Sequence, residues 1–131
     1  MKRIKVTAGI IVDNDRVLIT RRAAKESFAG GWEFPGGKIE AGEGPKECLA
    51  RELKEELAIE TEVGDFITLV EHDYKDISIS LAAYYCNILK GQIKVSVHDS
   101  YKWVKISDLL TYDLLPADIP IAKKLIKTRG M

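Results

Sequence analysis

The chain has 131 residues, enough for one domain that buries a hydrophobic core. Hydrophobic residues make up 46% of it and charged residues 31%, which is ordinary for a globular protein. Because 20 Lys and Arg residues balance 20 Asp and Glu residues, the basic surface that a nucleic acid polymer requires is not expected, whereas a small anionic ligand is compatible with this balance.

No segment of the sequence predicts a membrane protein, a leader or a disulfide framework. Cys48 and Cys86 are too few for a disulfide scaffold and are expected to be small buried residues. The N-terminal segment alternates like a strand, and no apolar run approaches the length of a membrane span. His72 and His98 have no metal-ligand spacing and are interpreted as structural or surface residues. We therefore expect one cytoplasmic domain over residues 1–131.

A β-hairpin is predicted at the start of the chain. Residues 3–12 and 16–21 are rich in β-branched side chains and flank the turn signal at 13–15. Residues 23–44 are rich in glycine and are interpreted as a functional loop with short extended pieces, such as 32–34.

A helix is predicted from Pro45 to about Leu57. Proline suits the first helical position because its φ is fixed and it has no N–H to leave unpaired. Gly44 is then the residue that caps the helix, without a side-chain oxygen.

The remaining elements alternate between strands and helical turns. They are strands at 62–71, 77–89 and 101–106, a turn at 90–92, a short helical turn capped by Ser107 and Asp108, and a helix at 119–127. Strands interleaved with two main helices predict an α/β layered domain with a mixed sheet.

Four glutamates around the first helix carry the main functional signal. Glu52, Glu55 and Glu56 stand at i, i+3 and i+4, so their carboxylates share one face, and Glu43 lies just before the helix. Like charges at this spacing repel and weaken a helix. Mg²⁺ is often shared between one or two carboxylates and a substrate phosphate. The cluster therefore predicts a metal-dependent enzyme that acts on phosphate groups.

The position of the cluster on the helix agrees with a cleft wall. The glutamates border the apolar arc that contains Leu53 and Leu57, and do not lie opposite it. Arg51 lies four residues from both Glu47 and Glu55, where it can offset the repulsion when no metal is bound.

The alternative interpretation is a solvated helix with ordinary charge pairs, which is a common pattern. The preceding sequence EFPGGKIEAGEG at 33–44 favours function, because its glycines permit backbone conformations closed to other residues and let a ligand come close. These glycines are Gly36, Gly37, Gly42 and Gly44.

The spacing of the motif over residues 37–59 resembles the Nudix box. The matching positions are Gly37, Glu43, Arg51-Glu52-Leu53, Glu55-Glu56 and the apolar Ile59. The likeness extends to three further segments, which resemble the MutT-type branch of that family: ITRRAA at 19–24, WEFPGGK at 32–38 and PADIP at 116–120.

The resemblance implies a Nudix-type α/β/α sandwich with a mixed β-sheet. For MutT-like members it implies hydrolysis of a nucleoside triphosphate to the monophosphate and diphosphate. It also implies Mg²⁺, for which Mn²⁺ often substitutes, held by Glu52, Glu55 and Glu56 with the Gly36 carbonyl nearby. Glu52 is then the base or the group that positions the water, and Glu43 supports the site. The catalytic candidates are Glu43, Arg51, Glu52 and Glu55.

Five residues are candidates for contacts with substrate. Arg22 matches a substrate-contacting position of MutT-type proteins and Lys38 follows the glycine pair, so both suit phosphate, although each also fits an exposed side chain. Asp118 stands where relatives present Asn or Asp to the base, and it also fits an N-cap of the last helix. Tyr74 and Phe28 suit base stacking, or else the core or rim.

The chain departs from the family pattern at three places. Members usually carry glycine at the position of Ala58, and alanine in a left-handed turn costs about 1 kcal/mol. Members that act on oxidised guanine carry an arginine shortly after the position of Tyr74, where this chain has residues 75–77 (KDI), and a late acidic residue where it has Lys102. The PADIP segment resembles cytidine-triphosphate-directed relatives at least as closely as it resembles the members that act on oxidised guanine.

These patterns predict a Mg²⁺-dependent nucleoside triphosphate pyrophosphohydrolase that sanitises nucleotides. The leading substrate is 8-oxo-dGTP, and CTP or a modified pyrimidine triphosphate is the runner-up. A catalytically silent nucleotide-binding module that regulates a partner is the alternative from another class, although the complete set of box residues favours turnover. A structural or Ca²⁺-binding acidic helix is a weaker alternative, because no EF-hand spacing is present. The expected partner is a small nucleotide, with no nucleic acid polymer and no membrane, for a monomer or homodimer.

Overall fold

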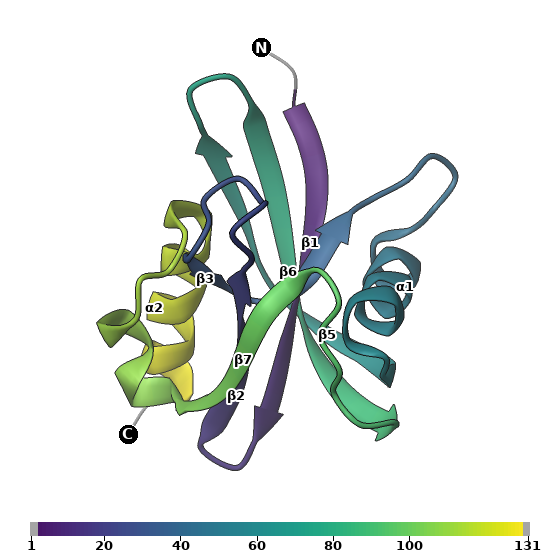
Figure 1. Cartoon of the computed structure of the whole chain (residues 1–131), viewed down its shortest axis with the longest axis vertical. Helices are drawn as coiled ribbons and strands as arrows, with labels where there is room; N and C mark the ends of the chain where they lie inside the picture. The colour runs from purple at the N-terminus through teal and green to yellow at the C-terminus, as the bar shows by residue number, and fades with distance from the viewer. Residues whose placement is uncertain (1–2, 130–131) are drawn as a thin grey trace.

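The computed structural model describes residues 3–129, which form a mixed sheet between two helices (Figure 1). The strands are β1 (Arg3–Asp13), β2 (Arg16–Arg22), β3 (Trp32–Glu33), β4 (Gly36–Lys38), β5 (Glu60–Asp73), β6 (Ser78–Lys90) and β7 (His98–Lys105). The helices are α1 (Pro45–Leu57) and α2 (Ile119–Arg129), with 3₁₀ turns η1 (Ile106–Thr111) and η2 (Pro116–Asp118). The predicted α/β/α sandwich with a mixed sheet is confirmed.

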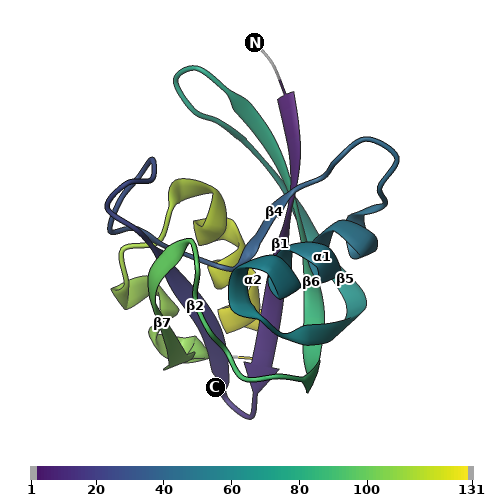
Figure 2. The same cartoon turned by 45° about the vertical axis from the view of Figure 1, so that its right-hand side comes forward.

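Strand β1 organises the sheet because it pairs with three other strands. Its end pairs antiparallel with β2, which confirms the predicted hairpin, and Asn14 takes the positive φ of 58° that the turn requires. Most of its length pairs parallel with β6, and its middle, Val6–Ala8, pairs antiparallel with β4 (Figure 2). Strand β4 thereby brings the glycine pair of the loop against the centre of the sheet.

The two helices cover opposite faces of the sheet, each over its own hydrophobic cluster. The apolar stripe of α1, which includes Leu49, Leu53 and Leu57, packs with Ile11 and Leu18. The other cluster packs the buried side chains of α2 against the opposite face of the sheet; it contains Ile121, Ala122 and Leu125 with Ile10, Ile19, Phe34 and Leu109. The predicted apolar arc of the first helix therefore faces the core.

The strand boundaries differ from the predicted ones by a few residues. Strand β5 extends the predicted segment 62–71 at both ends, β6 lies one residue later than the predicted segment 77–89, and β7 begins at His98 instead of residue 101. The expectation that Ser107 and Asp108 cap a helical turn is wrong: both lie inside η1, and Lys105 precedes it as the cap. In the part of the chain that the structure describes, no helix is long and apolar enough to cross a membrane.

Helix α1 begins and ends as the sequence indicates. Gly44 is its N-cap, Pro45 occupies the first turn, and the Glu47 carboxylate accepts a hydrogen bond from the Gly44 N–H at 3.3 Å. At the other end Ala58 adopts the left-handed conformation with φ 59° and ψ 32°, and its N–H donates to the Lys54 carbonyl at 3.1 Å. The turn usually closed by glycine is therefore kept with an alanine.

Replacing Ala58 with glycine should stabilise the protein. We expect Ala58→Gly to raise the free energy of unfolding by about 1 kcal/mol, because glycine adopts the left-handed conformation without steric cost. Urea denaturation followed by circular dichroism measures the change. Ala50→Gly, in the interior of the same helix, is the matched control and should lower the free energy by about 1 kcal/mol. A loss of stability in Ala58→Gly would contradict this account of the turn.

Candidate active site

A cleft of about 560 Å³ opens beside the glycine pair, within the size range of roughly 300–1,000 Å³ of small-molecule sites. Strands, the first helix and the η2 turn all contribute to its walls. The residues predicted from sequence that line it are Arg22, Phe28, Gly36, Lys38, Glu52, Glu56, Tyr74 and Asp118. The remaining three, Glu43, Arg51 and Glu55, are not among its lining residues.

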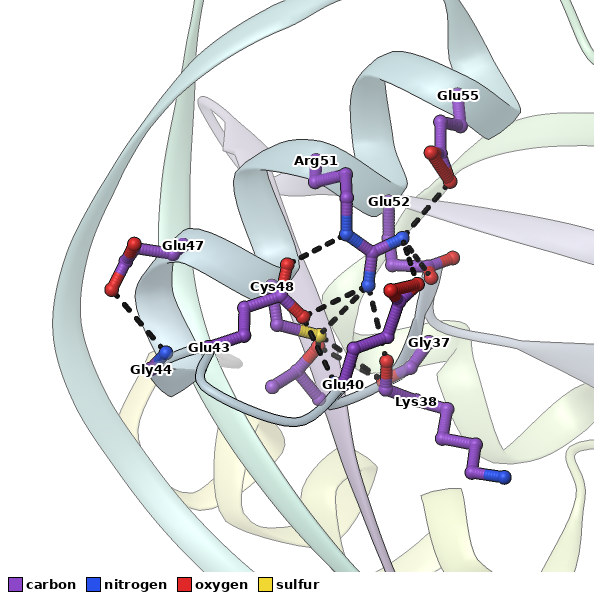
Figure 3. A network of polar contacts seen from close by, with 11 residues as sticks. Gly37, Lys38, Glu40, Glu43, Gly44, Glu47, Cys48, Arg51, Glu52 and Glu55 are labelled. Carbon is purple, nitrogen blue, oxygen red and sulfur yellow. Dashed lines mark hydrogen bonds and ion pairs between the residues drawn. The ribbon is translucent and has the colours of Figure 1, made fainter.

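Arg51 joins the residues that lie outside the cleft to those inside it (Figure 3). Its Nε and Nη2 donate to the two oxygens of Glu43 at 2.7 and 2.9 Å. Its Nη1 donates to Glu52 Oε1 at 2.8 Å and to Glu55 Oε1 at 3.0 Å. The expected reach to Glu55 is confirmed, whereas the Glu47 carboxylate bonds the N-terminus of the helix instead.

The arginine fixes the charge of the carboxylate beside it. The hydrogen bond from Arg51 is the main cause that lowers the pKa of Glu43 to about 2, with a second contribution from a backbone hydrogen bond at Glu40. The same contacts, above all the one with Glu43, raise the pKa of Arg51 above its usual value. Glu43 and Arg51 thus form a permanently charged pair that anchors the loop to the helix.

Glu52 and Glu56 stand side by side in the wall of the cleft. Burial is the largest cause that raises the pKa of Glu56 to about 9, followed by the hydrogen bond and the charge of Glu52. The Glu56 Oε1 atom is buried and has no hydrogen-bond partner among residues 3–129. Burial and the neighbouring Glu52 thus both favour the protonated form of Glu56.

The glycine pair is what allows this wall to form. A Cβ atom on Gly37 would collide with the carboxylate of Glu52, and one on Gly36 would collide with the Thr7 carbonyl. Strand β4 can therefore run between β1 and α1 only because neither residue carries a side chain. Close approach of backbone, and not an unusual φ, explains these two glycines.

A second group of residues in the cleft is suited to a flat, partly polar ligand. Asp118 is 5% exposed, and its Oδ1 accepts a hydrogen bond from the Phe34 N–H at 3.2 Å. Burial, with a smaller contribution from the charge of Glu33, raises the pKa of Asp118 well above its ordinary value. The Phe28 and Tyr74 rings lie 5.1 Å apart, and Phe28 remains 53% exposed.

Tyr74 is attached to the same part of the wall as Asp118. Its hydroxyl oxygen accepts a hydrogen bond from the Ala117 N–H at 3.2 Å, and its ring contacts His72 with centroids 4.5 Å apart. Asp118 ends the η2 turn just before α2 and bonds Phe34 across the cleft wall. An aromatic surface and a buried carboxyl group thus adjoin each other.

Two cleft residues, Glu33 and His98, were not predicted from the sequence. The Glu33 carboxylate lies 2.8 Å from His98 Nε2 and accepts from Arg22 Nη1 at 3.3 Å. His98 is buried, so of its two predicted roles, structural or surface, the structure agrees with the structural one. The two residues lie 65 positions apart, and no local spacing could have paired them.

The cleft thus combines three kinds of chemistry. Glu52 and Glu56 supply hard oxygen donors, Arg22 and Lys38 supply cationic groups for an anion, and the surroundings of Tyr74 and Asp118 supply a flat apolar surface with one buried polar group. A metal, a polyphosphate and a base are the ligand parts that these groups fit.

Comparisons with known proteins give the family of this chain. The family model for the NUDIX domain matches residues 3–127. The CTP pyrophosphohydrolase of Escherichia coli K12 is 36% identical over 130 residues, which cover 99% of this chain and 96% of that protein. The 8-oxo-dGTP diphosphatase of the same strain is 34% identical over 126 residues, which cover 95% and 98%.

A solved structure shows the same fold. The solution structure of the E. coli ORF135 protein superposes with a TM-score of 0.86 at 35% identity, and the match covers 99% of this chain and 93% of that one. Two findings establish the family: its model matches nearly the whole chain, and two relatives are more than 30% identical over nearly their full length. This chain belongs to the NUDIX domain family.

Proposed function

We propose that this chain hydrolyses a nucleoside triphosphate to the monophosphate and diphosphate, with Mg²⁺ as its metal and 8-oxo-dGTP as its leading substrate. One observation carries the proposal: the paired carboxyl groups of Glu52 and Glu56 share a single cleft with Tyr74 and the buried Asp118. The names of the two E. coli relatives, a CTP pyrophosphohydrolase and an 8-oxo-dGTP diphosphatase, support the class of substrate.

The residues present fit a divalent metal, which NUDIX hydrolases generally need. Glu56 Oε1 is a buried oxygen without a partner among residues 3–129, and burial together with the neighbouring Glu52 raises the pKa of Glu56, which disfavours the charged form in the absence of a cation. Glu52, Glu56 and the Gly36 carbonyl would hold Mg²⁺ or Mn²⁺, because hard cations prefer such oxygens. When bound, the cation would neutralise phosphate charge and lower the pKa of the attacking water.

Glu55 is the predicted metal ligand that fits least well. Its side chain is 59% exposed and bonds Arg51 at 3.0 Å. Among the described residues, no three or more acidic, His or Cys side chains are already arranged as a metal site. Arg51 explains this arrangement, because it draws Glu52 and Glu55 toward itself. Glu55 would join the ligands only by leaving the arginine.

The chemical step needs a proton acceptor and fixed phosphate contacts. Glu52 would take the proton of the attacking water as the water oxygen bonds to phosphorus and the anhydride bond breaks, releasing diphosphate. Arg22 and Lys38 would hold phosphate oxygens, since both line the cleft and carry positive charge. Glu43 acts through Arg51, which it keeps beside Glu52.

The buried Asp118 supports discrimination between bases. Burial favours the protonated form of Asp118, and a protonated carboxyl group donates one hydrogen bond and accepts another. The O6–N7 edge of 8-oxoguanine presents one acceptor and one donor, whereas ordinary guanine presents two acceptors there. The N3–N4 edge of cytosine also presents an acceptor beside a donor. This pattern favours 8-oxo-dGTP over dGTP, and it keeps CTP as the second candidate, together with the CTP-specific name of a relative at 36% identity.

A panel of nucleotides tests the proposal. With Mg²⁺ we expect release of diphosphate from 8-oxo-dGTP to exceed that from dGTP, CTP and a 5-substituted dCTP, and chelator to abolish it. Faster turnover of CTP or the modified pyrimidine would select the second candidate. Failure to turn over any of them, with nucleotide binding retained, would indicate the regulatory module instead.

The same assay includes a variant and its matched control. Glu52→Gln should lose most turnover while it melts at the wild-type temperature, because the amide cannot accept the proton of water. Glu60→Gln changes an exposed glutamate just beyond the helix, outside the cleft, and should keep full activity. Near-normal turnover in Glu52→Gln would refute the role given to that residue.

The raised pKa of Glu56 predicts how metal-free stability depends on pH. The folded state favours the neutral form, so this stability is complete below the unfolded value of 4.5 and is lost as pH rises toward about 9. Melting temperatures in chelator should therefore fall with pH more steeply in the wild type than in Glu56→Gln. Mg²⁺ should raise the melting temperature of the wild type only. Parallel pH curves for the two proteins would contradict this account.

A further inference from the structure

Three polar side chains form a continuous chain of hydrogen bonds across the cleft wall. Arg22 Nη1 donates to both oxygens of Glu33 at 3.3 Å, and Glu33 Oε2 lies 2.8 Å from His98 Nε2. The side chains are 25%, 17% and 4% exposed in that order. All three line the cleft, and each comes from a different strand: β2, β3 and β7.

The register of the sheet creates this chain. Strand β2 pairs with β3 on one side and with β7 on the other, and a shift in register between Arg21 and Arg22 places Arg22 opposite His98. Arg21 pairs with the exposed Asp99 at 2.7 Å, outside the cleft, whereas Arg22 reaches Glu33. The bulge thus sends two consecutive arginines to different partners.

The surroundings of His98 determine which nitrogen carries its proton. The Nδ1 atom is buried and has no hydrogen-bond partner within the described part of the chain. A hydrogen on Nδ1 would be a buried donor without a partner, whereas a hydrogen on Nε2 has the Glu33 carboxylate as its acceptor. We therefore assign a hydrogen to Nε2, from which the ring donates to the Glu33 carboxylate.

Glu33 in turn restricts the guanidinium of Arg22. Its carboxylate accepts from His98 on one side and from Arg22 on the other, so it cannot rotate without losing a bond. Arg22 Nε also donates to the Ser27 carbonyl at 2.6 Å. An arginine held in this way loses little further side-chain freedom when it meets an anion.

We propose that His98 is a positioning residue for substrate: it fixes Glu33, and Glu33 fixes Arg22 in the orientation that binds the phosphates of the nucleotide. This inference rests on the proposed function for the identity of the ligand as a polyphosphate. His98 needs no contact with substrate for this role, since it acts through its hydrogen bond to Glu33.

Steady-state kinetics with the preferred triphosphate test the inference. His98→Leu should raise KM about tenfold and leave kcat within about twofold, because the lost contact acts on binding and not on the chemical step. His98→Gln, whose amide N–H can reach Glu33, should restore most of the wild-type KM. The matched control is Asp99→Asn, which removes the partner of Arg21 on the same two strands outside the cleft and should change neither constant.

A double-mutant cycle distinguishes this role from a general structural one. In an Arg22→Ala background, His98→Leu should cause no further rise in KM, because the residue through which it acts is absent. An equal rise in both backgrounds, an unchanged KM in His98→Leu, or a loss confined to kcat would each overturn the proposal.

A measurement without turnover separates failure of this inference from failure of the proposed function. In the free wild-type protein at mildly alkaline pH, ¹⁵N spectra should show His98 protonated at Nε2 only. If the nucleotide panel shows no turnover, the dissociation constant for inorganic tripolyphosphate with Mg²⁺ replaces KM in the cycle. A ring protonated at Nδ1, or an affinity that His98→Leu does not change, would overturn the inference whatever the enzyme hydrolyses.

Discussion

The close approach of two carboxyl groups, those of Glu52 and Glu56, is the constraint on which the rest of the site depends. Helix α1 presents both to the cleft, and β4 closes in on them because Gly37 has no side chain that would collide with Glu52. Burial is the largest cause that raises the pKa of Glu56 to about 9, and the hydrogen bond and charge of Glu52 add to it. Ionising both Glu52 and Glu56 is therefore unfavourable in the metal-free protein, and a divalent cation between them would remove this penalty.

Arg51 limits that cost without removing it. It neutralises Glu43 and binds Glu52 and Glu55 from the side away from the cleft, but Glu56 receives no hydrogen bond from it. Arg22, which lines the cleft, is likewise occupied by Glu33. The arginine in the cleft, Arg22, is therefore held by an acidic partner, whereas Glu56 has no arginine bonded to it within residues 3–129.

Local sequence patterns predicted the helix, its first residue Pro45 and the carboxylates on it, because helical periodicity and a proline act over a few residues. The same periodicity placed Glu55 with Glu52 and Glu56, but could not show that Arg51 draws it outward to 59% exposure. The hairpin was also predicted, since its turn is local. Its neighbours in the sheet were not predicted, because they are set by contacts between distant segments.

The pairing of His98 with Glu33 shows most clearly where sequence reasoning ends. It depends on the register of β7 against β2 and on a bulge at Arg22, and neither leaves a signal in the spacing of residues. The burial of Asp118 also depends on distant contacts: the sequence allowed either a helix cap or a contact with the base, and in the fold its Oδ1 accepts a hydrogen bond from the Phe34 N–H.

The most direct test of the central claim is a crystal structure of the protein with Mg²⁺ and a non-hydrolysable nucleoside triphosphate analogue. We expect the ion between the Glu52 and Glu56 carboxylates and the phosphates, with Arg51 still bound to Glu43. A bound analogue with no ion at these carboxylates, and with Glu52 and Glu56 still hydrogen-bonded to each other, would contradict the account.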